Sequence, residues 1–300
     1  MGEHRSAQNE GFLMSYTTLI SAAQLQALIA RGDPLMVFDC SFELMKPLAG
    51  DEQFLESHIP GAVRANLDQH MSAQPGAATA SGGRHPLPTR ETFAAWLGSA
   101  GFNNGMQAVV YDRQGANYCG RLWWMLKWAG HENAAVLDGA LEAWYAAGGG
   151  VVTSGPPSVL KPRRFALRPQ RAVLATTPQV LEALGRATQS IIDARAPARF
   201  RGEVEPLDRV AGHLPGALNR PFGQNLGADG KFKPAAVLKA EFLELLDGRD
   251  PATVVHHCGS GVSAVPNIIA MEVAGLGRQA LYAGSWSEWC SDRSRPVARG

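Results

Sequence analysis

The sequence contains only four cysteines among its 300 residues, and they lie far apart, at Cys40, Cys119, Cys258 and Cys290. It has no C-x-x-C pair and no cysteine and histidine group at zinc spacing, so the pattern indicates neither a disulfide framework nor a metal site. Isolated cysteines in reducing compartments are mostly small buried residues. We therefore expect each thiol to be buried unless its neighbours indicate chemistry.

Long apolar runs and an excess of one charge are missing as well. No stretch approaches the roughly 18 apolar residues of a transmembrane helix, and residues 1–10 lack the apolar core of a secretory signal. The 28 Lys and Arg residues balance 27 Asp and Glu residues, so no net field would hold nucleic acid or an anionic membrane. We expect a globular, cytoplasmic protein without nucleic-acid or membrane partners, and a short disordered tail at residues 1–10.

The sequence does contain an internal repeat. S-H-I-P-G-A-V at residues 57–63 recurs as G-H-L-P-G-A-L at 212–218, and V-V-Y-D at 109–112 aligns with V-V-H-H at 254–257. The first half is longer between these motifs, and residues 71–83, rich in Ala, Ser, Gly and Pro, are the predicted insertion. A repeat of this length indicates two related domains.

The domain boundaries follow from composition. Glycines at residues 148–150 and S-G-P-P at 154–157 are typical of a linker. We therefore expect a first domain at residues 16–147, a linker at 148–170 and a second domain at 171–300.

Each half alternates short apolar runs with segments of helical length, which predicts α/β domains with a mainly parallel sheet flanked by helices. The alternation is the same in both halves. The predicted strands are residues 35–39, 107–112, 190–193 and 253–257, and the predicted helices are 89–99, 118–129, 235–246 and 262–274.

Cys258 follows the strand predicted at 253–257 and precedes Gly259-Ser260-Gly261 and a helix with Pro266 near its first turn. The carboxyl edge of a parallel sheet binds ligands, and the free N–H groups of a helix N-terminus favour an anion. Glycines at 259 and 261 allow positive φ angles that turn N–H groups toward the sulfur. The pattern predicts a nucleophilic thiolate; the alternative is a buried cysteine beside a simple turn.

Two tandem domains with the motifs H-I-P-G-A and C-G-S-G-V-S resemble the rhodanese superfamily over nearly the whole chain. The resemblance implies a sulfurtransferase in which Cys258 carries a persulfide, with no metal or organic cofactor. The first domain of such proteins is usually inactive. Here the alignment of the repeats puts Arg113 in the place of Cys258 and Asp112 in the place of His257.

The residues after the cysteine indicate the sulfur donor. Relatives that use thiosulfate typically place cations there, whereas Gly259 and Ser260 are neutral. The loop is similar to the form associated with 3-mercaptopyruvate, which is the expected donor, and thiosulfate is the alternative. A small thiol, a dithiol protein such as thioredoxin, or cyanide would serve as the acceptor.

The resemblance also implies roles for other residues. Arg199 is the candidate for binding the donor carboxylate, and Arg209 is nearest to the second arginine of relatives, although this region is shorter than their pattern. Ser260, His58 and Asp51 match a serine, histidine and aspartate set near the cysteine. His58 could equally brace its turn, and Arg209 could equally be a surface residue. The expected donor contacts in the loop itself are Gly259, Gly261, Val262 and Ser263.

Two rival functions depend on the same loop. Cysteine phosphatases of this fold need an arginine at the sixth position after the cysteine to clamp phosphate, and Ala264 stands there. A binding module without chemistry would not need Cys258 within an intact loop. Both rivals are therefore disfavoured.

Overall fold

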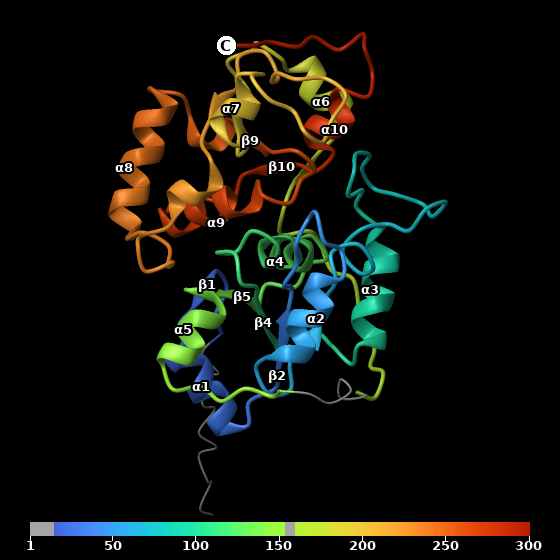
Figure 1. Cartoon of the computed structure of the whole chain (residues 1–300), viewed down its shortest axis with the longest axis vertical. Coiled ribbons are helices and arrows are strands. Elements are labelled where there is room, and N and C mark those ends of the chain that lie inside the picture. The colour runs from blue at the N-terminus through green and yellow to red at the C-terminus, as the bar shows by residue number, and fades with distance from the viewer. Residues whose placement is uncertain (1–14, 154–159) are drawn as a thin grey trace, which may run out of the picture.

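The computed structural model describes residues 15–153 and 160–300, which form two α/β units stacked along the long axis of the molecule (Figure 1). The expectations for residues 1–10 and for the S-G-P-P segment lie outside the described residues. Within the described part of the chain, no helix has the length and apolar character needed to cross a bilayer.

The first unit is built on a five-stranded sheet in which all paired strands are parallel, in the order β1-β5-β4-β2-β3. The central strand β4 is buried along its whole length, as expected of a strand covered on both faces. Its strands are β1 (Leu19–Ile20), β2 (Leu35–Asp39), β3 (Val63–Arg64), β4 (Gln107–Tyr111) and β5 (Ala134–Leu137). Its helices are α1 (Ala22–Arg31), α2 (Ala49–Glu56), α3 (Arg90–Ser99), α4 (Cys119–Trp128) and α5 (Ala140–Ala146).

The second unit repeats this topology, with parallel strands in the order β6-β10-β9-β7-β8. The prediction of two α/β domains is confirmed. The strands are β6 (Leu174–Ala175), β7 (Ser190–Asp193), β8 (Leu218–Asn219), β9 (Val254–His257) and β10 (Ala280–Tyr282). The α-helices are α6 (Thr177–Glu182), α7 (Pro197–Phe200), α8 (Ala235–Leu246), α9 (Val265–Val273) and α10 (Ser285–Trp289), and two 3₁₀ helices are η1 (Phe222–Asn225) and η2 (Pro251–Thr253).

Helices α4 and α9 meet where the two units join (Figure 1). Every residue of α4 is buried, because the rest of the first unit covers one side of the helix and α9 of the second unit covers the other. Gly120 allows the close contact, since a Cβ there would lie 3.3 Å from Val265. One continuous hydrophobic core thus contains α4, the residues around Cys258 and the start of α9.

Candidate active site

Cys258 lies directly after β9, at the carboxyl edge of the second sheet, and only 3% of it is exposed. The start of α10 holds its backbone. The Cys258 N–H donates to Ser285 Oγ at 3.1 Å, and the Trp286 N–H donates to the Cys258 carbonyl at 3.0 Å. Ser285 is buried and adopts a φ of +55°, which a non-glycine residue rarely takes. These contacts fix the cysteine at the sheet edge.

The backbone of the cysteine loop offers a row of free N–H donors. Among the described residues, the N–H groups from residue 259 to residue 264 have no hydrogen-bond acceptor. Gly261 adopts the expected positive φ, +72°, and a Cβ there would clash with the backbone of Ala283. Gly259 does not adopt a positive φ, so that part of the expectation is wrong. A buried loop with unpaired donors is suited to hold an anion.

The equivalent loop of the first unit corrects the alignment of the repeats. Tyr111 ends β4 and His257 ends β9, and each pairs with the aspartate that ends the neighbouring strand, β2 or β7. The residue that corresponds to Cys258 is therefore Asp112, and Arg113 lies one position later. The sequence match is wrong by one residue at these strands only. Val136 of β5 and Leu281 of β10 keep its spacing, so the second unit is one residue shorter between these two strands.

Asp112 shows what such a loop binds. Its carboxylate accepts hydrogen bonds from the N–H groups of Gln114 at 2.9 Å, Ala116 at 3.1 Å, Tyr118 at 2.8 Å and Cys119 at 2.9 Å. In the first unit the loop is thus filled by an anion of the chain itself. Counted from Cys258 at the same intervals, the positions in the second unit are Ser260, Val262 and Ala264, whose N–H groups have no acceptor among the described residues.

Ser260 is paired with a histidine from the other unit. His85 Nδ1 lies 2.7 Å from Ser260 Oγ, and His85 Nε2 lies 3.6 Å from Asp68 Oδ1. Burial, together with the charges of Arg121 and Arg84, lowers the pKa of His85 to about 3. The imidazole is therefore neutral at physiological pH and forms a Ser260–His85–Asp68 set beside the cysteine loop.

His58 does not belong to this set, which corrects the assignment made from the motif. Its ring stacks on Phe54 with centroids 3.9 Å apart, and its Nδ1 lies 2.7 Å from the Phe54 carbonyl. His213 makes the same contacts with Phe200 in the second unit, at 3.8 Å and 2.8 Å. Both motif histidines therefore brace the same turn, the alternative that the repeat itself had indicated.

Asp51 is also remote from the set. Its carboxylate accepts hydrogen bonds from Arg64 at 2.9 Å and Asn66 at 3.2 Å, within the first unit. The aspartate near His85 is Asp68 instead. Neither Asp68 nor His85 has a counterpart in a repeated motif, so no spacing in the sequence singled them out.

Two arginines lie over the cysteine loop, one from each unit. A Cβ on Gly259 would lie 3.1 Å from Arg84 Nη2 and 3.5 Å from Arg199 Nη1. Asp208 joins them, at 2.8 Å from Arg84 and 3.3 Å from Arg199, and Glu205 binds Arg199 at 2.6 Å. Burial raises the pKa of Asp208. The sequence singled out Arg199 as a candidate but not Arg84.

Arg209 is exposed, and it has no ion pair with any other described residue. The donor-binding role of Arg209 is thus supported by no contact and stays a prediction. The donor contacts expected at Val262 and Ser263 stay a prediction as well.

Arg84 and His85 reach the second unit through an arm formed by residues 82–85, at the end of the predicted insertion. The Gly82 N–H donates to Glu288 at 3.0 Å, and the Arg84 N–H donates to Ser287 Oγ at 3.0 Å. Gly83 lacks the side chain that would meet the Gly284 carbonyl at 2.6 Å. The insertion thus delivers side chains of the first unit to the cysteine loop.

The other three thiols lie outside the loop that follows β9. Cys40, Cys119 and Cys290 are buried, as predicted, and burial raises the pKa of each. A raised pKa keeps a thiol protonated and unreactive. In the described part of the chain, no group of three or more His, Cys, Asp and Glu residues could hold a metal ion.

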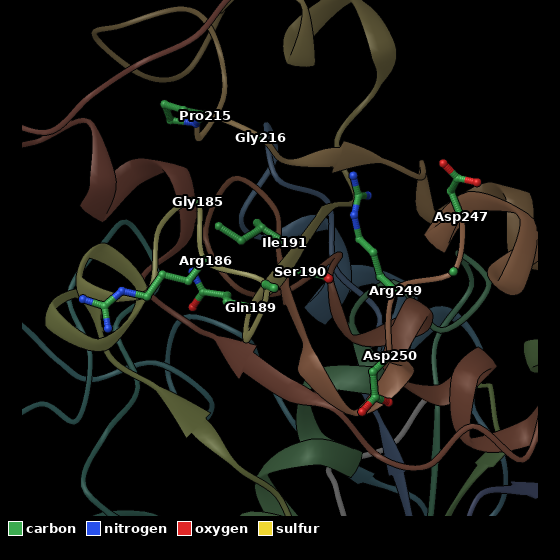
Figure 2. A pocket seen from close by; sticks show the side chains of 12 residues that line it. Gly185, Arg186, Gln189, Ser190, Ile191, Pro215, Gly216, Asp247, Arg249 and Asp250 are labelled. Atoms are coloured by element: carbon green, nitrogen blue, oxygen red, sulfur yellow. The ribbon is translucent and has the colours of Figure 1, made fainter.

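A separate pocket lies at the opposite edge of the second sheet (Figure 2). Ser190 and Ile191, the first residues of β7, line it together with Pro215, Arg249 and Asp250. It contains none of the residues around Cys258. Cys258 and its surrounding residues lie instead at the carboxyl edge, where parallel sheets bind ligands.

Comparison with known proteins identifies the family to which both units belong. The rhodanese-like domain matches twice, at residues 21–147 and 176–292. A probable 3-mercaptopyruvate sulfurtransferase of Pseudomonas aeruginosa is 43% identical over 288 residues, which cover 96% of this chain and 100% of that protein. A putative thiosulfate sulfurtransferase of Mycobacterium tuberculosis is 39% identical, covering 94% of this chain and 97% of that protein.

A solved structure matches as well. The crystal structure of a 3-mercaptopyruvate sulfotransferase from Escherichia coli has a TM-score of 0.74 and 30% sequence identity, and the match covers 91% of this chain and 100% of that one.

Proposed function

The chain belongs to the rhodanese family of sulfurtransferases, and we propose that it moves sulfur from 3-mercaptopyruvate, through a persulfide on Cys258, to a thiol acceptor. The observation that carries the proposal is the loop after Cys258, whose free N–H groups correspond to those that bind the Asp112 carboxylate in the first unit. A loop built to hold an anion stabilises both the attacking thiolate and a persulfide anion.

The first half of the reaction follows from this arrangement. The Cys258 thiolate attacks the sulfur of 3-mercaptopyruvate, an S–S bond forms, and the C–S bond breaks. The electron pair of the C–S bond stays with carbon, so pyruvate leaves as its enolate and then takes up a proton. The Ser260 hydroxyl, hydrogen-bonded to His85, is the proposed partner of the substrate carbonyl and of that proton.

The second half of the reaction releases the sulfur. A thiolate acceptor attacks the outer sulfur of the persulfide, the S–S bond breaks, and Cys258 returns to its thiolate form. A small thiol, a dithiol protein such as thioredoxin, or cyanide all fit this step. A reducing, cytoplasmic location is part of the proposal, because all four cysteines are free thiols.

The donor carboxylate is proposed to bind between Arg199 and Arg84. Their guanidinium groups lie over Gly259, where no loop side chain fills the space. Asp208 bridges the two arginines, and its carboxylate is the group that a donor carboxylate would replace. Arg199 keeps the role implied by the sequence, and Arg84 takes the role expected of Arg209.

Thiosulfate is the second candidate donor, and Arg84 is the observation that favours it. The loop residues Gly259 and Ser260 are neutral, but Arg84 brings a second cation to the same place from the other unit. Two guanidinium groups suit a dianion. The relative from Mycobacterium tuberculosis is named as a putative thiosulfate sulfurtransferase.

Steady-state rates with each donor, with cyanide as acceptor, decide between the two. We expect kcat/KM to be higher for 3-mercaptopyruvate than for thiosulfate, and Cys258→Ser to abolish both activities. Cys290→Ser is the matched control, because Cys290 is a buried thiol of the same unit that lies outside the loop. A higher kcat/KM for thiosulfate would reverse the donor assignment, and an active Cys258→Ser variant would exclude the mechanism.

A further inference from the structure

Arg121 is a fully buried cation of the first unit that touches the cysteine loop of the second. It lies in α4, and none of its surface is exposed. Its Nη1 donates to the Gly261 carbonyl at 2.9 Å, and its Nη2 donates to the His85 carbonyl at 2.9 Å and to the Met71 carbonyl at 3.4 Å. One side chain therefore binds the loop, the residue that pairs with Ser260, and the start of the insertion.

All of these acceptors are neutral. Among the described residues, no carboxylate lies within 4.0 Å of the Arg121 guanidinium, and its Nε has no acceptor. Lys127, another buried cation of α4, is different, because its Nζ lies 3.3 Å from the Glu132 carboxylate. Burial of an unpaired cation is costly unless an anion lies nearby.

Cys258 is the group that can supply that anion. Burial lowers the pKa of Arg121 to about 10, and the charge of Cys258 acts in the opposite direction. Arg121 thus stays protonated at neutral pH, next to a loop whose sulfur can ionise. The unpaired charge and the reactive thiol are complementary.

The hydrogen bond to the Gly261 carbonyl lets the charge of Arg121 act on the cysteine loop. The Gly261 carbonyl and the Val262 N–H belong to the same peptide group, so a cation on the oxygen strengthens the N–H as a donor. In the first unit the residue at the same distance along the chain from Asp112 is Ala116, whose N–H binds the Asp112 carboxylate at 3.1 Å. The Val262 N–H is free for the equivalent role.

We propose that Arg121 is the counter-charge of the catalytic sulfur, and that the inactive unit contributes it to the active one. Arg121 stabilises the Cys258 thiolate and the persulfide anion directly and through the Gly261–Val262 peptide. It is a positioning residue, because it does not touch the substrate. The inference rests on the proposed role of Cys258 as a thiolate, but it is independent of which sulfur donor the protein uses.

Other charged and titratable groups also face the loop, and each has a partner or is neutral. Arg84 and Arg199 are paired with Asp208. Burial lowers the pKa of His85 to about 3 and also lowers the pKa of His257, so both imidazoles are neutral at pH 7. Asp193, which faces His257, is paired with Arg195 at 2.6 Å. Within the part of the chain described here, Arg121 is therefore the cation behind the loop that no carboxylate pairs.

The test is the pH dependence of alkylation of Cys258 by iodoacetamide, which reads the thiolate without a sulfur donor. The protein also contains the buried thiols Cys40, Cys119 and Cys290, so the label at Cys258 is measured separately by peptide mass spectrometry. In Arg121→Met we expect the midpoint of the rate profile to rise by about one pH unit, and the rate at pH 7 to fall up to about tenfold. Arg121→Lys keeps a charge and should retain most of the wild-type rate.

Lys127→Met is the matched control, because it removes a buried cation from the same helix at a position paired with Glu132. We expect its alkylation profile to coincide with that of the wild type even if its thermal stability falls. A natively folded Arg121→Met with the wild-type profile would overturn the proposal, and so would an equal shift in Lys127→Met.

A second measurement leaves Arg121 in place and so does not depend on whether its variants fold. Cys258→Asp copies the carboxylate that Asp112 places in the first loop, and Cys258→Asn is its neutral match. We expect the aspartate variant to have the higher Tm at pH 7. A lower Tm for Cys258→Asp than for Cys258→Asn would mean that the loop disfavours an anion, and would contradict the proposal.

Discussion

His85 and His58 are both buried histidines of the first unit, but only His85 contacts the cysteine loop. We expect His85→Ala to lower kcat for 3-mercaptopyruvate by roughly 10²-fold, in the range of general acid and base groups. The loss should be smaller in the transfer of persulfide sulfur to an acceptor, because that step needs no enolate protonation. Stopped-flow measurement of pyruvate release and of sulfur transfer separates the two steps.

His58→Ala provides the comparison. It removes the ring that stacks on Phe54, so its expected effect is a lower Tm with kcat nearly unchanged. If His58→Ala lowered kcat as much as His85→Ala, the assignment of His85 would be wrong.

The arginines over Gly259 should affect donor binding more than turnover. We expect Arg199→Ala and Arg84→Ala each to raise KM for 3-mercaptopyruvate by about tenfold or more, because a charged hydrogen bond contributes about 1.5–3 kcal/mol. Arg209→Ala, at an exposed position, should leave KM within about twofold of the wild type. A large KM effect in Arg209→Ala alone would restore the role that the sequence pattern suggested.

At the scale of elements, we expect substitutions of the two glycines of the loop to have different effects. Gly261 has a φ of +72° and contacts the Ala283 backbone, so Gly261→Ala should destabilise the fold by about 2 kcal/mol or more and abolish activity. A Cβ at Gly259 would meet only the ends of Arg84 and Arg199, which can move. Gly259→Ala should therefore keep its stability and mainly raise KM, as urea denaturation and steady-state kinetics would show. Equal loss of stability in both variants would contradict this account of the loop.

Four of the ten strands and four of the ten α-helices of the described residues could be predicted from the sequence. Residues 35–39, 190–193 and 235–246 form the predicted elements with the same bounds. They were recognisable because buried parallel strands are continuous apolar runs and α8 has a helical period. Cys258 was recognisable because its chemistry depends on a contiguous loop.

The rest of the site depends on contacts that no local pattern encodes. His85 and Arg84 lie in an arm that has no counterpart in the second half, and they reach the loop only when the two units pack together. The motif histidine His58 was the conspicuous candidate, but its partner lies in the same turn. Arg121 lies in a helix of mostly apolar residues, and no motif in the sequence indicated that its side chain contacts the cysteine loop.

At the scale of the whole molecule, buried histidines predict sensitivity to acid. Burial is the main cause that lowers the pKa of His70 and His131 to about 4, and of His85 and His256 to about 3. Between about pH 6.5 and these values the unfolded chain binds more protons than the folded one, so stability falls as pH falls. Each histidine can contribute up to about 1.4 kcal/mol per pH unit.

Urea denaturation between pH 7.5 and pH 4.5 measures this loss. His256→Val should make the slope with pH shallower, and valine fits there because Val110 occupies the corresponding position of β4. An unchanged slope in His256→Val, or a stability that does not fall toward pH 4.5, would contradict the expectation.

The central claim is that Cys258 carries the sulfur. The most direct measurement is the mass of the intact protein after brief exposure to one equivalent of 3-mercaptopyruvate without an acceptor. The account predicts a mass gain of one sulfur atom, located at Cys258 by peptide mapping, lost on addition of a thiol and absent in Cys258→Ser. Sulfur transfer without that adduct, or an adduct on another cysteine, would contradict it.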